Sequence, residues 1–257
     1  IGFDDNDFNE ANFAKDISNH LKTDHSEAYV SEKDLIDVIP LLPEIYCEPF
    51  GDSSQIPTYL VSKLSSQKTK VILSGDGADE IFGGYNRYYY AEKIFSSTNN
   101  IPFFLTKIIS KILVLVSKYN KNNYQNFFLK KEIPQFNEKL VKLSKIINRD
   151  RNFLYQTLIS SSLNCSNLIK NFKLVKTNKD EFNQNLDFFE SMQFLDLNNY
   201  LQNDILTKVD RASMYCSQEV RVPYLNLNVV NADWSLPKEF KKNKLVLKKN
   251  FRAIYSK

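Results

Sequence analysis

The segment Val71-Ile72-Leu73-Ser74-Gly75-Asp76-Gly77-Ala78-Asp79-Glu80-Ile81-Phe82-Gly83-Gly84-Tyr85 carries most of the information in this chain. An apolar run of strand length ends at a serine, and glycines and carboxylates follow it. Four of the six glycines of the chain fall here, and small residues allow tight turns and close approach of backbone to a ligand. Because open α/β sheets bind ligands at the carboxyl ends of their strands, the segment predicts a nucleotide or metal site. Gly-Asp-Gly taken alone also fits a purely structural turn.

The chain before Tyr85 predicts strands alternating with helices. Apolar spacing predicts a helix over residues 9–21, and Ser31 with Asp34 predicts a capping box for a helix that reaches residue 45. Ser53 or Ser54 is expected to cap the next helix, which runs to residue 66. Short strands are expected at residues 1–3 and 27–30, and a buried strand at 69–74. This alternation is typical of a parallel sheet, so the predicted fold class is α/β.

After Tyr85 the pattern changes to helices joined by polar loops. Residues 1–95 are therefore expected to form a nucleotide-binding α/β part, and residues 96–257 a mainly helical part. Asparagine-rich stretches at 120–126 and 177–185 predict loops. The expected helices cover residues 88–95, 102–118, 151–162, 200–206, 208–217, 226–235 and 245–255.

Composition excludes several classes of protein. The formal net charge of the 257 residues is only +4 and is scattered, which argues against a nucleic-acid partner. Cys47, Cys165 and Cys216 match neither a disulfide framework nor a zinc site, and they indicate reduced thiols in the cytoplasm. The apolar run 101–116 contains two lysines and is shorter than the ~20 residues of a membrane span. A buried or interface helix is expected there, with no membrane.

Four motifs together resemble the asparagine synthetase (glutamine-hydrolysing) family, in its C-terminal synthetase domain. The first is the Ser74–Tyr85 part of the segment above. The second, Glu48-Pro49-Phe50-Gly51-Asp52-Ser53-Ser54, resembles the substrate loop of the family. The other two are Asp204-Ile205-Leu206-Thr207-Lys208-Val209-Asp210-Arg211 and Glu219-Val220-Arg221-Val222-Pro223-Tyr224-Leu225.

The resemblance implies a fold of the ATP-pyrophosphatase type, ATP and Mg²⁺ as cofactors, and a two-stage reaction. ATP activates aspartate as an aspartyl-adenylate, and ammonia then attacks to give asparagine. Ammonia comes from glutamine in a glutaminase domain of the same parent chain, and a homodimer is possible in this family. The Ser-Gly-Gly-x-Asp-Ser phosphate loop and the glutaminase domain are not found in the sequence. The expectation is therefore a domain truncated at both ends, inactive by itself.

The resemblance also implies nucleotide contacts. Ser74 and Gly75 match nucleotide-binding positions, and Ile1 matches a residue that touches adenine. Asp76 matches the position tied to forming and consuming the adenylate, and Asp79 matches a magnesium ligand. Simple strand-end and turn roles are the alternatives for Ser74 and Gly75.

Lys244, in Lys244-Leu245-Val246-Leu247-Lys248, matches a catalytic lysine that contacts phosphate and developing charge; a solvated helix face is the alternative. Asp52 and Ser53 match the amino-acid substrate loop, with helix capping by Ser53 as the competing interpretation.

Two further questions stay open in the sequence. Asp210, Arg211, Glu219 and Arg221 could form a buried ion network around the pocket, as structural support or as substrate contacts. The acceptor could also be another carboxylate, as in surface polysaccharide assembly, because a fold constrains chemistry more loosely than a site does. A non-catalytic nucleotide- or partner-binding module is the rival from another class.

Overall fold

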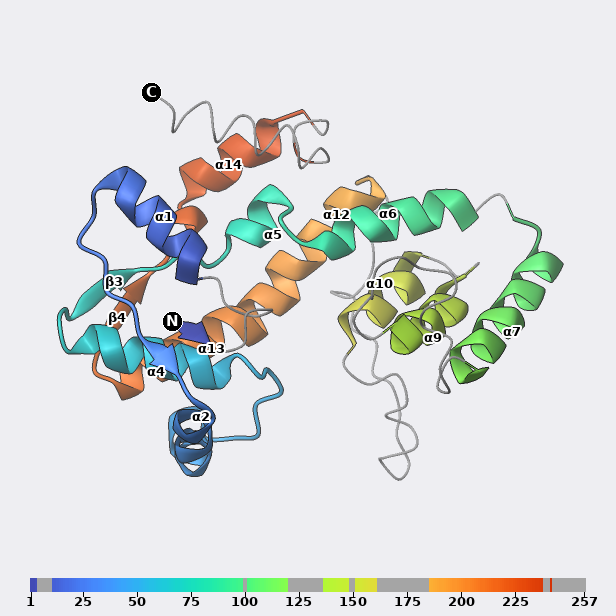
Figure 1. Cartoon of the computed structure of the whole chain (residues 1–257). Helices are drawn as coiled ribbons and strands as arrows, with labels where there is room; N and C mark the ends of the chain where they lie inside the picture. Colours follow the sequence, from blue (N-terminus) through green and yellow to red (C-terminus); the bar gives the residue numbers. More distant parts are fainter. Residues whose placement is uncertain are drawn as a thin grey trace. The chain divides into compact units, whose positions relative to one another are not determined.

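The computed structural model describes residues 1–3, 11–98, 101–119, 136–147, 151–160, 185–237 and 241 (Figure 1). The described residues are mostly helical and include short parallel strand pairs, which confirms the α/β class. The chain divides into two compact units, each built from two stretches of sequence. The first comprises residues 1–77 and 200–232, and the second residues 78–199 and 233–257.

Two parallel strand pairs belong to the first unit. Strand β1 (Gly2–Phe3) pairs with β2 (Tyr29–Val30), and β3 (Val71–Leu73) pairs with β4 (Glu219–Arg221), as Figure 1 shows for the second pair. The prediction of a buried strand before the glycine turn is wrong. Val71 is 43% exposed and Leu73 is 71% exposed, because β4 is the one strand of the described residues that pairs with β3.

The helices of the first unit begin where the sequence signals predict. Ser31 and Asp34 form the predicted capping box at the start of α2, with the Ser31 side chain accepting from the Asp34 N–H and the Asp34 side chain accepting from the Ser31 N–H. The predicted helix to residue 45 is divided into α2, a 3₁₀ turn and α3. The elements are α1 (Ala11–Leu21), α2 (Glu32–Val38), η1 (Ile39–Leu41), α3 (Leu42–Tyr46), α4 (Gln55–Ser66), α13 (Thr207–Tyr215), η5 (Pro223–Leu225) and α14 (Leu227–Ser235), the last of which ends in the second unit.

The core of the first unit lies where α13 packs against α4 and α3. Its buried residues are Val38, Ile45, Tyr46, Tyr59 and Ala212. Helix α1 behaves differently, because its apolar stripe Phe13, Ile17 and Leu21 is 72%, 61% and 50% exposed. The helical period of this stripe was predicted correctly, but the stripe is not part of that core.

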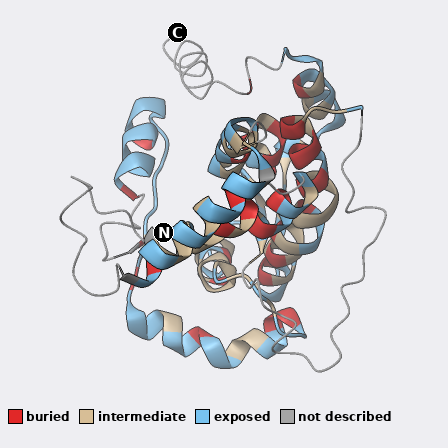
Figure 2. Cartoon of the chain, turned by 90° about the vertical axis from the view of Figure 1, so that its right-hand side faces the viewer, coloured by how far each residue is buried: buried red, intermediate tan, exposed pale blue. Residues whose placement is uncertain are grey.

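The second unit is helical throughout its described residues. A buried cluster joins α6, α10 and α12 around Tyr88, Leu154, Phe189, Met192 and Leu195. Figure 2 shows buried and exposed residues on the same helices, as expected for helices that pack on one face. The helices are α5 (Ala78–Phe82), α6 (Asn86–Thr98), α7 (Phe103–Tyr119), α9 (Phe136–Ile146), α10 (Arg151–Ile159) and α12 (Phe188–Leu195).

A π-helix, η4 (Asp196–Leu206), follows α12 directly and leads into α13. Asp187 caps α12 in a capping box with Glu190. Between residues 163 and 206 the sequence predicts a helix only from residue 200 onward. Helix α12 and the first turn of η4 were therefore missed. Long π-helical stretches are rare, and a sequence pattern of period 3.6 does not reveal them.

Helix α7 covers most of the apolar run at residues 101–116. Its Ser110 hydroxyl donates to the Ser144 carbonyl of α9 at 2.7 Å, while Phe104, Ile108 and Ile112 are 63%, 51% and 52% exposed. Across the described ranges, every helix is too short or too polar to cross a membrane. The loop predictions at 120–126 and 177–184 and the helix prediction at 245–255 lie outside the described residues.

Candidate functional site

The glycine turn begins where the pairing of β3 with β4 ends. The Ser74 N–H donates to the Arg221 carbonyl at 2.9 Å, and the Ser74 hydroxyl donates to the Asp76 carboxylate. The Asp76 N–H in turn donates to Ser74 Oγ at 3.3 Å. Ser74 and Asp76 are therefore held side by side at the carboxyl end of a parallel strand, as the sequence predicts.

Two glycines shape this turn in different ways. A Cβ at Gly75 would meet no atom within 4 Å, so the backbone at Gly75 is open to a ligand. Gly77 has φ +83°, and a Cβ there would lie 2.7 Å from Leu225 Cδ2. A residue other than glycine at 77 would be strained both by its backbone conformation and by this close approach.

Asp79 lies in the first turn of α5, in the second unit, and its side chain is exposed. The Asp79 carbonyl accepts from the Gly84 N–H at 2.9 Å, and a Cβ on Gly84 would overlap Asp79 Oδ1. The absence of a side chain at residue 84 therefore leaves the space that the Asp79 carboxylate occupies. Gly83 has φ +68° and faces the Phe189 ring.

Replacing Gly84 with alanine is expected to displace the Asp79 carboxylate, because the new methyl group would occupy its position. If Asp79 serves the phosphates, aspartate-dependent pyrophosphate release should fall by up to about 100-fold, because a displacement of about 1 Å at a reacting centre can cost that much. The control is glutamate production from glutamine in the same samples, which should persist if the glutaminase is a separate domain. Unchanged release in the Gly84 variant would contradict a role for the Asp79 position.

The side chain of Glu80 is buried inside the second unit. It is 1% exposed, and burial is the main cause that raises its pKa above the usual value. The Tyr85 hydroxyl donates to Glu80 Oε1 at 2.5 Å. The Gln193 amide donates to the carbonyls of Glu80 and Ile81 at 3.0 and 2.6 Å, which fastens α5 to α12. Glu80 is thus part of the packing of this unit and is not exposed to a ligand.

The predicted magnesium site depends on Asp79. Among the described ranges, no three His, Cys, Asp or Glu residues gather as a metal site would require. Mg²⁺ is usually bound by one or two carboxylates together with substrate phosphates, so an exposed Asp79 carboxylate fits the chemistry of that ion. Asp79 as a ligand remains a prediction.

The predicted substrate loop is fastened to α13 by Lys208. The Lys208 ammonium donates to the Asp52 carboxylate and, at 2.6 Å, to Ser54 Oγ. Asp52 also accepts from the N–H and the hydroxyl of Ser54, at 2.9 and 2.7 Å. Burial works against the charge of Asp52, but the bonds from Lys208 and Ser54 outweigh it and lower the pKa of this carboxyl.

The N-cap of α4 is Ser54, and it makes no side-chain capping bond. The competing interpretation, in which Ser53 caps this helix, is therefore wrong. Ser53 is exposed, and no residue that the structure describes forms a hydrogen bond with its side chain. Of the two predicted substrate-binding residues, Asp52 is therefore anchored, and Ser53 has no side-chain hydrogen bond to a described residue.

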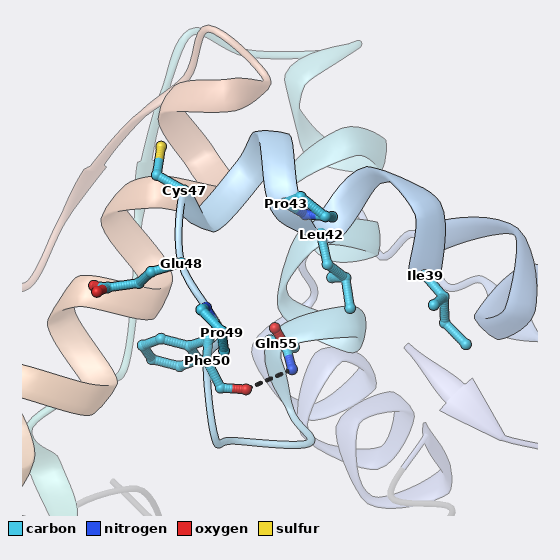
Figure 3. Close-up of a pocket in the computed structure, with 8 residues that line it drawn as sticks. All are labelled: Ile39, Leu42, Pro43, Cys47, Glu48, Pro49, Phe50 and Gln55. Atoms are coloured by element: carbon cyan, nitrogen blue, oxygen red, sulfur yellow. Dashed lines mark hydrogen bonds between the residues drawn. The ribbon is translucent and has the colours of Figure 1, made fainter.

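A pocket of about 410 Å³ lies beside this loop in the first unit (Figure 3). Its walls are mostly apolar, and two of its lining residues are joined by a hydrogen bond from the Gln55 amide to the Phe50 carbonyl at 3.1 Å. Arg211 donates to the Tyr46 carbonyl and to Glu48 Oε1, the latter at 3.2 Å. The lining residues are Ile39, Leu42, Pro43, Cys47, Glu48, Pro49, Phe50 and Gln55.

The prediction of a buried ion network among the late-motif charges is wrong. The Arg221–Glu219 pair is exposed, with side chains 63% and 56% accessible, and Asp210 is exposed as well. The strand β4 turns these alternate residues to solvent. Arg211 supports the loop through Tyr46 and Glu48, which favours the structural role over substrate contact.

Two predicted site residues lie at or beyond the ends of the described residues. Ile1 is half-buried and precedes β1, and Lys244 lies outside the described residues. Ser74, Gly75 and Asp76 belong to the first unit and Asp79 to the second. The convergence of Ser74, Gly75, Asp76, Asp79 and Lys244 in one cleft therefore stays a prediction.

A buried carboxylate that the sequence did not single out organises the second unit. Asp196 is fully buried and accepts from Arg87 Nη2 and Nε at 2.7 and 3.2 Å, from Tyr155 at 2.5 Å, and from Tyr88. Burial opposes the charge of Arg87, but Asp196 outweighs it and raises the pKa of the guanidinium. The partners Tyr155, Tyr88 and Arg87 are 41, 108 and 109 positions away from Asp196 along the chain, so no local signal could have found them.

Comparison with known proteins gives a consistent result. The family model described as asparagine synthase matches residues 1–257. The chain is 32% identical over 225 residues to "Putative asparagine synthetase [glutamine-hydrolyzing] 2" of Methanocaldococcus jannaschii, covering 87% of this chain and 41% of that protein. It is 25% identical over 241 residues to "Asparagine synthetase [glutamine-hydrolyzing] 1" of Bacillus subtilis, covering 94% of this chain and 36% of that protein.

A shorter match is 40% identical over 82 residues to "Asparagine synthetase [glutamine-hydrolyzing] 1" of Arabidopsis thaliana, covering 30% of this chain and 14% of that protein. No solved structure matches the chain. The chain spans 36% and 41% of the length of the bacterial and archaeal relatives above. Since the family model extends from the first residue to the last, the chain belongs to the asparagine synthase family.

Proposed function

We propose that the complete gene product carrying this chain converts aspartate to asparagine with ATP, through an aspartyl-adenylate, and that ammonia comes from glutamine. The observation that carries this proposal is the family match over residues 1–257. The names of the relatives add glutamine hydrolysis, which we assign to a glutaminase domain of the same parent chain. The proposal includes a sheet of the ATP-pyrophosphatase type and a location in the cytoplasm, where Cys47 and Cys216 would stay reduced.

The glycine turn supplies chemistry that suits this reaction. The Ser74 hydroxyl and the open backbone at Gly75 can accept and donate hydrogen bonds to a nucleotide, with Ile1 against the adenine. The Asp76 carboxylate, held by Ser74, can take up a proton when ammonia attacks the activated carboxyl group. Asp79 would hold Mg²⁺, which when bound screens the repulsion between substrate carboxylate and phosphate. Lys244 is proposed to contact the phosphate.

The substrate loop is proposed to bind the amino acid through Asp52 and Ser53. Its attachment to α13 through Lys208 keeps it in one conformation before substrate arrives. Preorganisation of this kind lowers the entropic cost of binding.

The test is pyrophosphate release by the complete gene product with ATP and one carboxylic acid at a time. L-aspartate should support release, and L-glutamate, succinate and hexuronic acids should not. Asparagine formation from aspartate should require glutamine or ammonia. Release with a hexuronic acid but not with aspartate would reject aspartate as the substrate and favour an amidotransferase of polysaccharide assembly. ATP binding with no release in any arm would favour a non-catalytic module.

A further inference from the structure

Helix α7 turns hydroxyl groups inward and apolar side chains outward. Thr106 and Ser117 are 2% and 6% exposed, and the Ser117 hydroxyl donates to the Val114 carbonyl of the same helix at 2.8 Å. The Ser110 hydroxyl donates to the Ser144 carbonyl of α9, which lies beside α7 in the same unit (Figure 1). The buried side chains in the described part of α7 thus carry hydroxyl groups, whereas a surface helix normally buries apolar ones.

The opposite side of α7 is an exposed apolar stripe. At 3.6 residues per turn its members cover an arc of about 120°, and no charged residue of α7 falls within that arc. An exposed row of large apolar side chains indicates a surface that another molecule covers. This α7 stripe consists of Phe104, Leu105, Ile108, Ile112, Leu115 and Val116, whose exposed fractions lie between 39% and 63%.

The charged residues of α7 are all lysines, and they lie together. Lys107, Lys111 and Lys118 are exposed and fall within an arc of about 40° along one edge of the α7 stripe. No carboxylate in the described parts of the chain forms an ion pair with Lys111 or Lys118. The neighbouring α9 adds three more lysines to the sequence against one glutamate. The apolar stripe therefore has a positively charged edge.

These two features together favour one kind of partner. A second copy of the chain offers no carboxylate on α7 to pair with the lysines, and an antiparallel pairing would place the two lysine rows side by side. An anionic lipid surface complements both features. The apolar side chains enter the boundary of the hydrocarbon, and the long stems of the lysines let their ammonium groups stay at the level of the phosphates.

We propose that α7 lies flat on an anionic phospholipid surface, with the α7 stripe against the hydrocarbon and Lys107, Lys111 and Lys118 facing the headgroup phosphates. A helix in this plane needs an apolar face and a basic edge, but not the length of a membrane span. A lipid partner departs from the expectation drawn from the sequence, which concerned a spanning helix. The inference does not depend on the proposed function, because none of these residues belongs to the four family motifs.

The experiment is cosedimentation of the complete gene product with vesicles of phosphatidylcholine alone, or with a quarter of that lipid replaced by phosphatidylglycerol. Binding to the anionic vesicles should be at least ~10-fold stronger and should weaken as salt is added, because attraction to lipid phosphates is screened. Lys111→Glu combined with Lys118→Glu should weaken it at least ~20-fold, since each lysine near such a surface contributes about 5-fold. The control is Lys33→Glu combined with Lys63→Glu, which changes the net charge equally at exposed lysines of the first unit and should leave binding unchanged.

The apolar half of the inference is tested by Ile108→Ser combined with Ile112→Ser. These exchanges should weaken binding to anionic vesicles at least ~10-fold, because each removes a large apolar side chain from the buried contact. The control is Ile17→Ser combined with Ile36→Ser, since those side chains are 61% and 62% exposed on helices of the first unit and should not matter. Far-UV circular dichroism shows whether each variant is folded.

A gain of signal decides the inference even if the serine variants do not fold. Leu115→Trp places an indole in the α7 stripe, and its added fluorescence over that of the parent protein should shift to shorter wavelength when anionic vesicles are mixed in. Leu21→Trp, at a similarly exposed leucine of α1, should show no shift. The chain contributes one natural tryptophan to the background, Trp234.

Three results would overturn the inference. The first is equal or absent binding to the two kinds of vesicle. The second is binding that the α7 variants and the control variants change to the same extent. The third is a change in oligomeric state in the Ile108→Ser and Ile112→Ser variant, measured by sedimentation equilibrium, with vesicle binding unaltered, which would assign the α7 stripe to a second copy of the chain.

Discussion

Replacing Asp79 with asparagine is expected to lower aspartate-dependent pyrophosphate release by the complete gene product at least ~100-fold, because a metal ion stabilises phosphate charge in such reactions by several kcal/mol. Asparagine keeps the size of the side chain but removes the charge that would hold Mg²⁺. The carboxylate is exposed in the first turn of α5, so the exchange should not disturb the core. The measurement is pyrophosphate release as a function of Mg²⁺ concentration.

Glutamate production from glutamine, followed in the same samples, should persist in this variant if the glutaminase is a separate domain. The matched control is Asp37→Asn, since Asp37 is an exposed carboxylate of α2 in the other unit. Release near the parent rate, with the same Mg²⁺ dependence, would reject Asp79 as a metal ligand. The same assay on the chain of 257 residues alone should show no release, and activity there would reject the expectation that this chain is inactive by itself.

The largest effect on stability is expected from Asp196→Asn. The substitution removes the negative charge that lies 2.7 Å from Arg87 Nη2, and it leaves a guanidinium whose side chain is 20% exposed. Breaking a buried ion pair from one side costs about 3–5 kcal/mol, because the remaining charge is uncompensated. Tyr88 and Tyr155 would also lose a charged acceptor. The measurement is urea unfolding followed by far-UV circular dichroism, with amide exchange in α6, α10 and α12.

Glu219→Gln is the control for this prediction, because its pair with Arg221 is exposed and surface pairs contribute about 0–1 kcal/mol. Amide exchange should become faster in α6, α10 and α12 of the Asp196 variant and stay the same around α4. A change in the free energy of unfolding similar to that of the control would show that the Asp196 cluster does not hold these helices together.

Local signals predicted most helices of the first unit because each signal depends on residues close in sequence. The capping box of Ser31 and Asp34 and the period of Phe13, Ile17 and Leu21 involve neighbours three or four positions apart. The glycine turn was predicted for the same reason, since the bonds between Ser74 and Asp76 span two residues. The family motifs supplied the expected chemical roles of the site residues, and these roles remain predictions.

Burial and long-range pairing were not predictable in this way. The apolar run Val71–Leu73 is expected to be buried from its composition, yet its exposure depends on which strands pair with it. Lys208 stood inside a recognised motif, but its partners Asp52 and Ser54 lie more than 150 positions away. Asp196 lies in none of the four family motifs. Such contacts depend on tertiary packing, which overrides what a single sequence indicates.

Cys47 ends α3 with φ 63° and lies exposed beside the pocket, next to the loop that carries Glu48 and Phe50. The thiol of Cys216 is half-buried, and burial raises its pKa, so it forms the reactive thiolate less readily. With Cys165 replaced by serine, a fluorophore attached to Cys47 would lie within a few covalent bonds of the loop. The rest of the first unit would keep its natural sequence. The natural sequence thereby offers an optical reporter through which the arrival and departure of an amino acid could be timed directly.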